Sequence, residues 1–366
     1  MDEFDTPPSA IDAGGRLLIH APNIHQGGGR TLLIALLQAL AISHEWKQVV
    51  VTLDERLKLD ESLTGKLTTV RVAPTLLARL RAEWSLSKSA RREDLLLCFG
   101  NLPPLLAVQA RVVLFLQNHY LIEGVPALEL PFRLKTRLQI ERMWLRRAVH
   151  RCNVVIVQSP SMQRRVEKVL GVKAIVAPFV EAASSRGESA PEKTLDYLYV
   201  ASGEPHKNHR RLIEAWIHLA EQGLFPSLGL TLDPVVHEVL CKWITDKAAL
   251  HALQIKMLGT LSSGQIERTY LGSKALIFPS LFESFGLPLV EAMALGVPIL
   301  ASERDYVRDV ITPVETFDPE SPVSIARAVL RHLHLPHKTT ALMTGQDFKQ
   351  TFLAPSSSIP TGASIQ

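Results

Sequence analysis

The sequence predicts an α/β fold with two Rossmann-like domains, each built on a doubly wound parallel sheet, that face a central cleft. The chain has 366 residues, which suits about two domains of ordinary size. Its strand candidates are continuous apolar runs rather than alternating ones, as a sheet covered on both faces requires. These runs alternate with helical patterns along most of the chain, which indicates parallel strands joined by helices.

The predicted elements form two series, separated by a small, polar, Pro-containing segment, EAASSRGESAPEK at 181–193, that is typical of a linker. The first series has strands at 16–21, 48–53, 68–72, 95–99, 111–117, 153–158 and 174–178, and helices at 31–42, 132–149 and 161–170. The second has strands at 195–201, 228–232, 255–258, 275–279 and 298–301, and helices at 209–222, 234–249, 262–271, 288–295 and 323–332. We therefore expect an N-terminal domain at 14–182, a C-terminal domain at 194–335 and a partly disordered tail at 336–366.

The net charge of +4 is unevenly divided. Residues 1–180 carry 24 Lys and Arg against 16 Asp and Glu, whereas the remainder carries 16 against 20. A basic half suits nucleic acid, an anionic membrane surface or a phosphorylated ligand, and a solvated face explains it equally well. No recognised nucleic-acid module accompanies the charge, so no nucleic-acid partner is expected. Three widely spaced cysteines favour the cytoplasm.

The segment 275–302 predicts the most specific chemistry. A buried strand ends near Ser280, a loop carries Glu283, and a helix opens near Pro288 with Glu291 expected in its first turn. The free N–H groups at such a helix start suit a diphosphate, and two carboxylates suit the vicinal hydroxyls of a ribose or a sugar ring. A nucleotide-sugar has both kinds of group. A helix-dipole role for Glu291 and a solvated Glu283 stay open as the plain alternative.

This segment, FPSLFESFGLPLVEAMALGVPIL, resembles the signature of the family 4 glycosyltransferases, a retaining group with the GT-B fold. A second block, YVASGEPHKNHRRLIEAW at 199–216, places Lys207–Asn208 at the family's Lys-Asn pair. The resemblance covers about residues 195–310 and is weaker over the N-terminal half.

The resemblance implies a role for each matching residue. Glu283 would bind hydroxyls of the donor sugar, and Lys207 would neutralise the leaving diphosphate. The remaining donor contacts would come from Glu291 on the ribose, the backbone amides of Phe285, Gly286 and Leu287, and Asn208. One position departs from the pattern, because Ser202 stands where the family usually has a phosphate-binding Arg. Either another cation substitutes, with His206, Arg210 and Arg30 as candidates, or donor binding is weaker.

Two polar segments of the N-terminal half are further candidates. Gly27–Gly29, ahead of the helix at 31–42, resembles the family's Gly-rich first loop, in which Gly28 and Gly29 would approach the donor diphosphate. A dinucleotide fingerprint is the rival interpretation, although Leu32 stands in place of its last Gly. His119, at the end of a strand, resembles a cleft histidine near the reacting sugar, and a structural turn histidine is the alternative.

These observations predict a retaining, metal-independent hexosyltransferase that uses a UDP- or GDP-sugar, with mannose favoured, and a glycan or lipid-linked glycan acceptor in cell-surface polysaccharide or lipopolysaccharide assembly. The sequence contains no Asp-x-Asp motif, so no metal ion is expected, and no other cofactor is expected either. The basic segment 131–151 predicts peripheral contact with the inner face of the cytoplasmic membrane, with an ordinary surface helix as the alternative. A GT-B epimerase and a non-catalytic GT-B protein stay open, the latter because of Ser202 and because no Trp-containing crossover helix is evident near the C-terminus.

Overall fold

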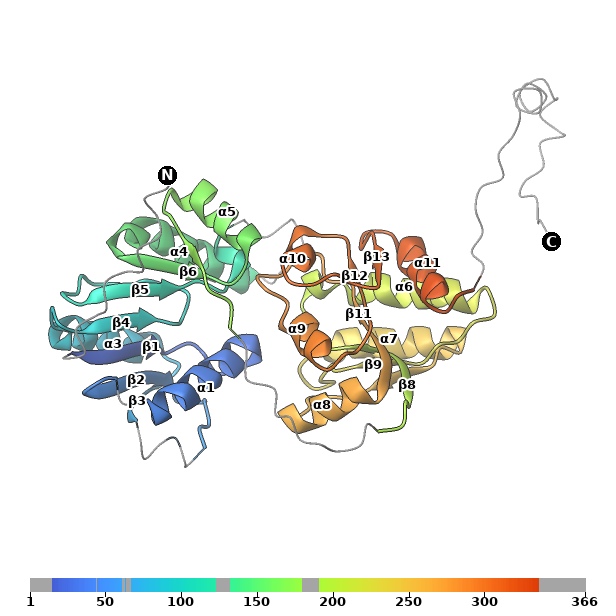
Figure 1. Ribbon diagram of the computed structural model, residues 1–366, viewed down its shortest axis with the longest axis horizontal. Helices are drawn as coiled ribbons and strands as arrows, with labels where there is room; N and C mark the ends of the chain where they lie inside the picture. The colour runs from blue at the N-terminus through green and yellow to red at the C-terminus, as the bar shows by residue number, and fades with distance from the viewer. Residues whose placement is uncertain are drawn as a thin grey trace, which may run out of the picture.

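The computed structural model describes residues 15–43, 45–60, 63, 67–122, 132–179 and 191–335. These residues form two α/β domains that lie side by side, the N-terminal one drawn in blue to green and the C-terminal one in yellow to red (Figure 1). The predicted tail at 336–366 and most of the predicted linker lie outside the described residues. Two Rossmann-like parallel-sheet domains, as the sequence predicts, are confirmed.

The N-terminal sheet contains seven described strands in the order β3-β2-β1-β4-β5-β6-β7, and its pairs are parallel. The strands are β1 (Arg16–Ala21), β2 (Gln48–Asp54), β3 (Thr68–Val72), β4 (Leu95–Cys98), β5 (Arg111–Phe115), β6 (Val154–Val157) and β7 (Ile175–Val176). The strand order reverses between β1 and β4. Ligands of such sheets bind outside the carboxyl ends of the strands at this reversal.

Helices cover both faces of this sheet. On one face, α1 (Gly27–Ile42) packs through Leu32, Leu33 and Leu37 into one hydrophobic cluster. The helices on the opposite face, which contribute to a second cluster, are α3 (Leu76–Ser89), α4 (Phe132–Ala148) and α5 (Pro160–Leu170). Crossovers between parallel strands are right-handed. The crossover after β1 leads toward the β3 edge of the sheet, whereas those after β3, β5 and β6 lead toward the β7 edge, so their helices lie on opposite faces.

The C-terminal sheet contains six described strands in the order β10-β9-β8-β11-β12-β13, again in parallel pairs. The strands are β8 (Leu195–Tyr199), β9 (Leu228–Leu230), β10 (Ile255–Met257), β11 (Ser273–Phe278), β12 (Ile299–Ser302) and β13 (Glu315–Phe317). The helices are α6 (His209–Ala220), α7 (Glu238–His251), α8 (Ser263–Leu271), α9 (Leu287–Ala294), α10 (Asp305–Arg308) and α11 (Pro322–His332). Trp216, 1% exposed, lies in the single large core that these elements enclose.

Several elements differ from the sequence prediction. Helix α1 begins at Gly27 rather than Thr31, so Gly27–Gly29 form its first turn instead of a preceding loop. Helix α3 was also not predicted; its large apolar side chains face outward, and Glu83 and Leu86 are its buried residues. Strand β13 and helix α10 were also not predicted, since three or four residues carry too little periodic signal.

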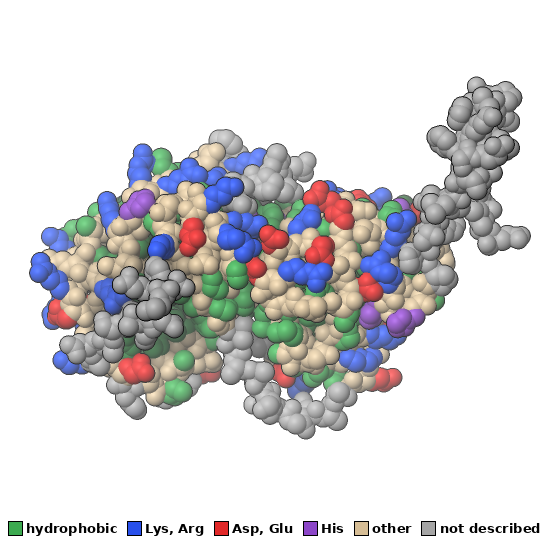
Figure 2. Space-filling view, turned by 45° about the horizontal axis from the view of Figure 1, so that its top comes forward, with side chains coloured by type: hydrophobic (Ala, Val, Ile, Leu, Met, Phe, Trp, Pro, Cys, Tyr) green, Lys and Arg blue, Asp and Glu red, His purple; other side chains and the backbone are tan. Residues whose placement is uncertain are grey.

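The charge asymmetry of the sequence is visible on the surface. Figure 2 shows Lys and Arg side chains gathered along the upper part of the N-terminal domain, whereas the C-terminal domain carries both signs together. Within the described residues, no helix is both long enough and apolar enough to cross a membrane.

A buried histidine begins α6. His209 is 3% exposed, and its ring lies 4.8 Å from that of Tyr199. Neither ring nitrogen has a hydrogen-bond partner among the described residues. Burial is the main cause that lowers the pKa of His209 to about 3, and the charge of the neighbouring Lys207 contributes in the same direction. His209 is therefore folded in its neutral form, and unfolding at mildly acidic pH must protonate it.

We expect the free energy of unfolding to fall as the pH drops from about 6.5 to about 4. In this window the unfolded chain binds a proton on His209 that the folded chain does not, which costs on the order of 2 kcal/mol of stability between about pH 7 and pH 5. His209→Phe keeps a ring against Tyr199 and should remove about one proton from the uptake on unfolding. Denaturant titrations at several pH values measure this, and an unchanged pH slope in the variant would contradict it.

Candidate functional site

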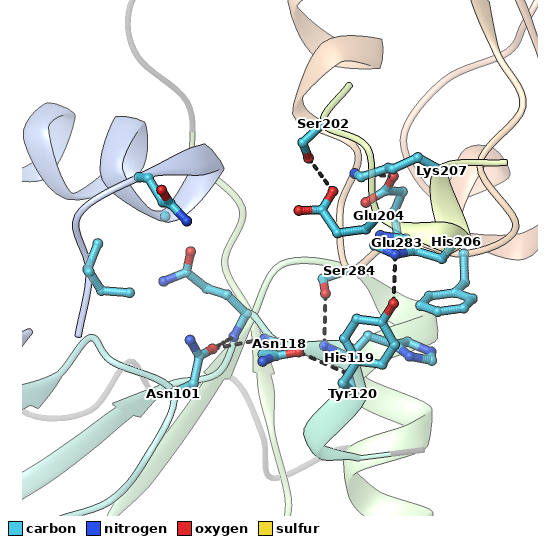
Figure 3. Close-up of a pocket in the computed structure, with 15 residues that line it drawn as sticks. Asn101, Asn118, His119, Tyr120, Ser202, Glu204, His206, Lys207, Glu283 and Ser284 are labelled. Carbon is cyan, nitrogen blue, oxygen red and sulfur yellow. Dashed lines mark hydrogen bonds and ion pairs between the residues drawn. The ribbon is translucent and has the colours of Figure 1, made fainter. Parts of the chain in front are cut away.

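A cavity of about 350 Å³ lies between the two domains (Figure 3). The N-terminal domain lines it with Ile24, Gln26, Gly29, Asn101 and Gln117–Tyr120, and the C-terminal domain with Ser202, Glu204, His206, Lys207 and Phe282–Ser284. These residues follow the carboxyl ends of strands in both sheets, so the cavity occupies the place that the two topologies predict for a ligand. Among the predicted site residues, Lys207, Glu283, His119 and Gly29 meet there.

Lys207 and Glu283 form an ion pair in the cavity. Lys207 ends the short helix η3 (Pro205–Lys207) after β8, and Glu283 lies in the loop after the neighbouring strand β11. Lys207 Nζ is 2.7 Å from Glu283 Oε1, and the two side chains are only 17% and 12% exposed. Because both side chains are largely withdrawn from water, removing one partner leaves the other charge uncompensated.

Hydrogen bonds from two buried side chains fix the backbone at and next to Lys207. Tyr199 Oη donates a hydrogen bond to the Lys207 carbonyl at 2.6 Å. Asn208, at φ 63°, is buried and donates from Nδ2 to the carbonyls of Pro279 (3.1 Å) and Pro319 (2.7 Å). The structure thus places Asn208 beneath the cavity wall, where its amide joins three loops. The resemblance implies a donor contact for Asn208, and the side-chain contacts seen here are structural ones.

An aromatic stack crosses the cleft beside the ion pair. The Phe282 ring lies between those of His119 and His206, with centroid distances of 4.8 Å on both sides. Phe282 immediately precedes Glu283, and His206 immediately precedes Lys207. The stack therefore fixes the backbone of both charged residues, and His119 contributes to it from the N-terminal domain.

Tyr120 adds a hydrogen bond across the interface between the two domains. Its Oη lies 2.7 Å from His206 Nδ1. Burial lowers the pKa of His206 to about 4, so the imidazole is neutral at neutral pH, while burial raises the pKa of Tyr120. The phenol therefore stays protonated and donates a hydrogen bond to Nδ1. The neutral His206 ring then carries its own hydrogen on Nε2.

Serine residues extend these contacts between the domains. The His119 N–H donates to Ser284 Oγ at 3.1 Å, and Ser159 Oγ donates to the Ser284 carbonyl at 3.0 Å. Further along the seam, the Ser161 N–H donates to Asp309 Oδ2 at 2.7 Å. Ser284, next to Glu283, is thus bonded to two separate segments of the N-terminal domain.

Two helix starts face each other at the cleft. A Cβ at Gly28 in α1 would lie 2.9 Å from Leu287 Cδ1 in α9, and Leu287 packs against the N-terminal core. Neither helix has a side-chain cap or an acidic residue in its first turn. Gly286 precedes α9 at φ 81°, a conformation that favours glycine. Two uncompensated positive dipole ends therefore converge at one place, with Gly28, Phe285, Gly286 and Leu287 around it.

Glu291 lies deeper than the sequence analysis predicts. Because α9 begins at Leu287, Glu291 falls in the second turn rather than the first. Its Oε2 accepts a hydrogen bond from Tyr270 Oη at 2.9 Å, and the pKa of Tyr270 is raised by burial and by this carboxylate. Glu291 does not line the described cavity, which is bounded by Glu283 on that side.

The described lining of the cavity contains two carboxylates and a single Lys or Arg, Lys207. Ser202, which replaces the usual Arg, donates its hydroxyl hydrogen to Glu204. Burial raises the pKa of Glu204, but this hydrogen bond and the charge of Lys207 outweigh it, and the net pKa lies below the ordinary value. Of the candidate substitutes, His206 lines the cavity in neutral form and Arg210 lies over the Trp243 ring at 4.6 Å.

Several lining residues escaped the sequence analysis. Phe282, Tyr120 and Glu204 each adjoin or nearly adjoin a residue that it did select, yet aromatic and acidic residues beside a motif carry no distinguishing pattern. Asn101, at φ 70°, accepts hydrogen bonds from the backbone of Gln117 (2.6 Å) and Asn118 (2.8 Å), which only the structure reveals. The described residues contain no group of three or more side chains spaced to hold a metal ion.

A model of a known protein family matches the part of the chain that supplies Lys207 and Glu283. Residues 181–344 match the model of the glycosyl transferases group 1. The match covers the C-terminal domain, which is similar to the glycosyl transferases of group 1. This domain supplies Lys207 and Glu283, and its match begins in the predicted linker.

Curated relatives match the chain over part of their own length. The chain is 27% identical over 139 residues to O-antigen chain mannosyltransferase B of Escherichia coli, a match that covers 37% of this chain and 36% of the relative. It is 25% identical over 179 residues to O-antigen chain mannosyltransferase RfbU of Salmonella typhimurium, covering 47% and 48%. The chain thus spans less than half the length of these curated relatives.

Solved structures share the whole architecture. HepE of Anabaena, crystallised with UDP and glucose, superimposes with a TM-score of 0.63 at 15% identity, covering 87% of this chain and 90% of that one. At this identity the likeness establishes the fold. The two parallel-sheet domains facing a cleft form a GT-B fold.

We expect Tyr120→Phe to loosen the contact between the domains. The substitution removes the hydrogen bond to His206 and leaves Nδ1 without its partner, a loss on the order of 1 kcal/mol. Small-angle X-ray scattering should then show a more open molecule. Tyr197→Phe is the matched control, because Tyr197 Oη makes the same kind of bond to His332 Nδ1 at 2.9 Å within the C-terminal domain. Equal radii of gyration for wild type and Tyr120→Phe would contradict the prediction.

Proposed function

We propose that the protein is a retaining glycosyltransferase that moves a hexosyl residue, in first place mannosyl, from a nucleoside-diphosphate sugar to a glycan acceptor without a metal ion. The observation that carries the proposal is the convergence of two helix starts, at Gly28 and at Leu287, next to the cavity that Gly29 and the half-buried Lys207 line. A diphosphate is the group that such a place stabilises, since backbone N–H donors, two helix dipoles and one ammonium all favour negative charge.

The remaining polar groups have roles that follow from their position. Glu283 is an acceptor that exchanges its bond with Lys207 for hydroxyl groups of the donor sugar when the diphosphate attracts Lys207. Glu204 is held as an acceptor by Ser202 and suits a second hydroxyl. The cavity volume of about 350 Å³ suits a sugar ring with part of the adjoining acceptor.

The chemistry requires charge stabilisation rather than a strong side-chain acid. As the bond from the anomeric carbon to the diphosphate breaks, negative charge grows on the leaving phosphate oxygen, and Lys207 with the helix N–H groups is placed to stabilise it. The acceptor hydroxyl would attack from the face that the diphosphate leaves and give its proton to a phosphate oxygen, so that the new bond keeps the original configuration. The contacts of His119, Tyr120 and Ser284 across the seam exclude water from this step.

The mannosyl donor and the acceptor are inferred from relatives. Two relatives of the chain are mannosyltransferases of O-antigen chains, which favours a mannosyl donor and a cell-surface glycan acceptor. A structural neighbour holds UDP and glucose, so the base needs its own test. Release of nucleoside diphosphate from GDP-mannose and from UDP-hexoses, measured with each candidate acceptor, identifies the base.

We expect Lys207→Ala and Glu283→Gln each to lower turnover by on the order of 10²–10³-fold, because each removes charge stabilisation or sugar positioning in a closed site. Lys274→Ala is the matched control, since Lys274 Nζ forms an ion pair of the same 2.7 Å length with Asp196 outside the cavity. Nucleoside diphosphate release at saturating donor measures the effect. Equal losses in Lys207→Ala and Lys274→Ala would contradict the assignment.

EDTA should leave the rate unchanged, and NMR of the product should show the donor's anomeric configuration. Loss of activity on chelation, restored by a divalent cation, would overturn metal independence. An inverted product would overturn retention while leaving the glycosyltransferase assignment in place.

A further inference from the structure

Helix α3 has its polarity reversed relative to an ordinary surface helix. Its single acidic residue, Glu83, points inward and is 7% exposed. Glu83 Oε1 lies 2.8 Å from His20 Nε2, and Oε2 accepts a hydrogen bond from the Leu105 N–H at 2.8 Å. The inward face of α3 is therefore anchored by polar contacts as well as by Leu86.

The outward face of α3 is apolar. Leu76, Leu77, Leu80 and Trp84 are 75%, 68%, 42% and 61% exposed. At 3.6 residues per turn these four side chains fall within an arc of about 100°. A stripe of large apolar side chains on one face of a helix, turned toward water, marks an interaction surface rather than scattered exposure.

A neighbouring loop widens this stripe. Leu105 and Leu106, which follow β4, are 37% and 40% exposed. The loop is bonded to α3 at two points, through the Leu105 N–H to Glu83 and through Ser87 Oγ to the Ala107 carbonyl at 2.8 Å. The two leucines therefore adjoin the helix in a fixed arrangement.

Cations border the stripe. Arg81 and Lys88 are exposed on α3, and the exposed Arg151 donates to the Leu105 carbonyl at 3.4 Å. The adjoining helix α4 exposes further cations, among them Arg146 and Arg147. We call the α3 surface the set formed by Leu76, Leu77, Leu80, Trp84, Leu105, Leu106, Arg81, Lys88 and Arg151.

We propose that the α3 surface binds an anionic lipid bilayer and holds the protein at the membrane as a peripheral protein. The leucines and Trp84 would enter the boundary between headgroups and acyl chains, and the cations would contact the anionic headgroups beside them. A second copy of the chain is a poorer occupant, because a twofold interface through this face would bring Arg81 and Lys88 close to their own copies.

The position of α3 gives this contact a direction. The helix runs antiparallel to the strands, so its first turn, with Leu76 and Leu77, lies at the carboxyl edge of the N-terminal sheet. The cavity opens at that same edge. A bilayer on the α3 surface would therefore bring membrane-borne molecules to the N-terminal side of the cleft. The sequence analysis predicted membrane contact for segment 131–151, whose helix α4 exposes Ile140 and Met143 together with its cations, and the proposal adds the apolar stripe of α3 to it.

The test measures co-sedimentation of the full chain with vesicles of phosphatidylcholine alone and vesicles that also contain phosphatidylglycerol. We expect binding to the mixed vesicles that weakens with salt. Leu80→Ser combined with Trp84→Ser should lower the partition coefficient by on the order of tenfold or more. Because both side chains are exposed, the thermal unfolding of this variant should match that of the wild type.

Two further variants make the result specific. Arg81→Glu combined with Lys88→Glu should remove the preference for the mixed vesicles. Val235→Ser combined with Val239→Ser is the matched control, because these valines are 89% and 79% exposed on the C-terminal domain. This control should bind vesicles as the wild type does.

Three outcomes would overturn the proposal. The wild type could fail to bind the mixed vesicles, or the variants of α3 and of Val235 with Val239 could lose binding equally. Light scattering could also show a dimer of the wild type that Leu80→Ser with Trp84→Ser converts to a monomer, which would make the surface an interface between copies. Vesicle binding needs no turnover, so failure here is separate from failure of the proposed enzymatic function.

Discussion

Lys207 Nζ and Glu283 Oε1 lie 2.7 Å apart in a place where both side chains are largely withdrawn from water. Two opposite charges so placed must stay together or find new partners, because neither can be left alone without a cost of several kcal/mol. Strands β8 and β11 are neighbours, so the loops that follow them hold Lys207 and Glu283 at one point of the sheet edge. Asn208 and Tyr199 then fix the Lys207 backbone from below.

The N-terminal domain completes the site without adding a Lys or Arg to its described lining. His119 and Tyr120 contact Phe282 and His206, the residues immediately before the charged pair. Beside the ion pair the domains are thus coupled through aromatic and hydrogen-bonding contacts, and further along the interface Asp309 accepts a hydrogen bond from the Ser161 N–H and lies 3.9 Å from Arg164. A ligand that displaces Glu283 from Lys207 acts directly beside these contacts, so binding and domain closure are linked physically through adjacent residues.

Sequence patterns predicted most of what depends on periodicity and on local chemistry. Continuous apolar runs located twelve of the thirteen described strands, and the loop-and-helix chemistry together with the family resemblance selected Glu283 and Lys207, although not the ion pair between them. Patterns could not predict contacts that form only when distant segments meet. Phe282 joins His119 across 163 positions, and no local signal marks that pairing. Helix α3 was also missed. Its apolar residues face water and its Glu83 faces the core, the reverse of what is expected of a surface helix.

The central claim is that a diphosphate draws Lys207 away from Glu283 and lies between the starts of α1 and α9. A crystal structure of the protein with its nucleoside-diphosphate sugar bound tests this directly. We expect Lys207 Nζ on a phosphate oxygen, the N–H groups near Gly28 and Gly286 directed at the diphosphate, and Glu283 on a hydroxyl of the sugar. A diphosphate bound away from both helix starts, with the ion pair between Lys207 and Glu283 intact, would contradict the account.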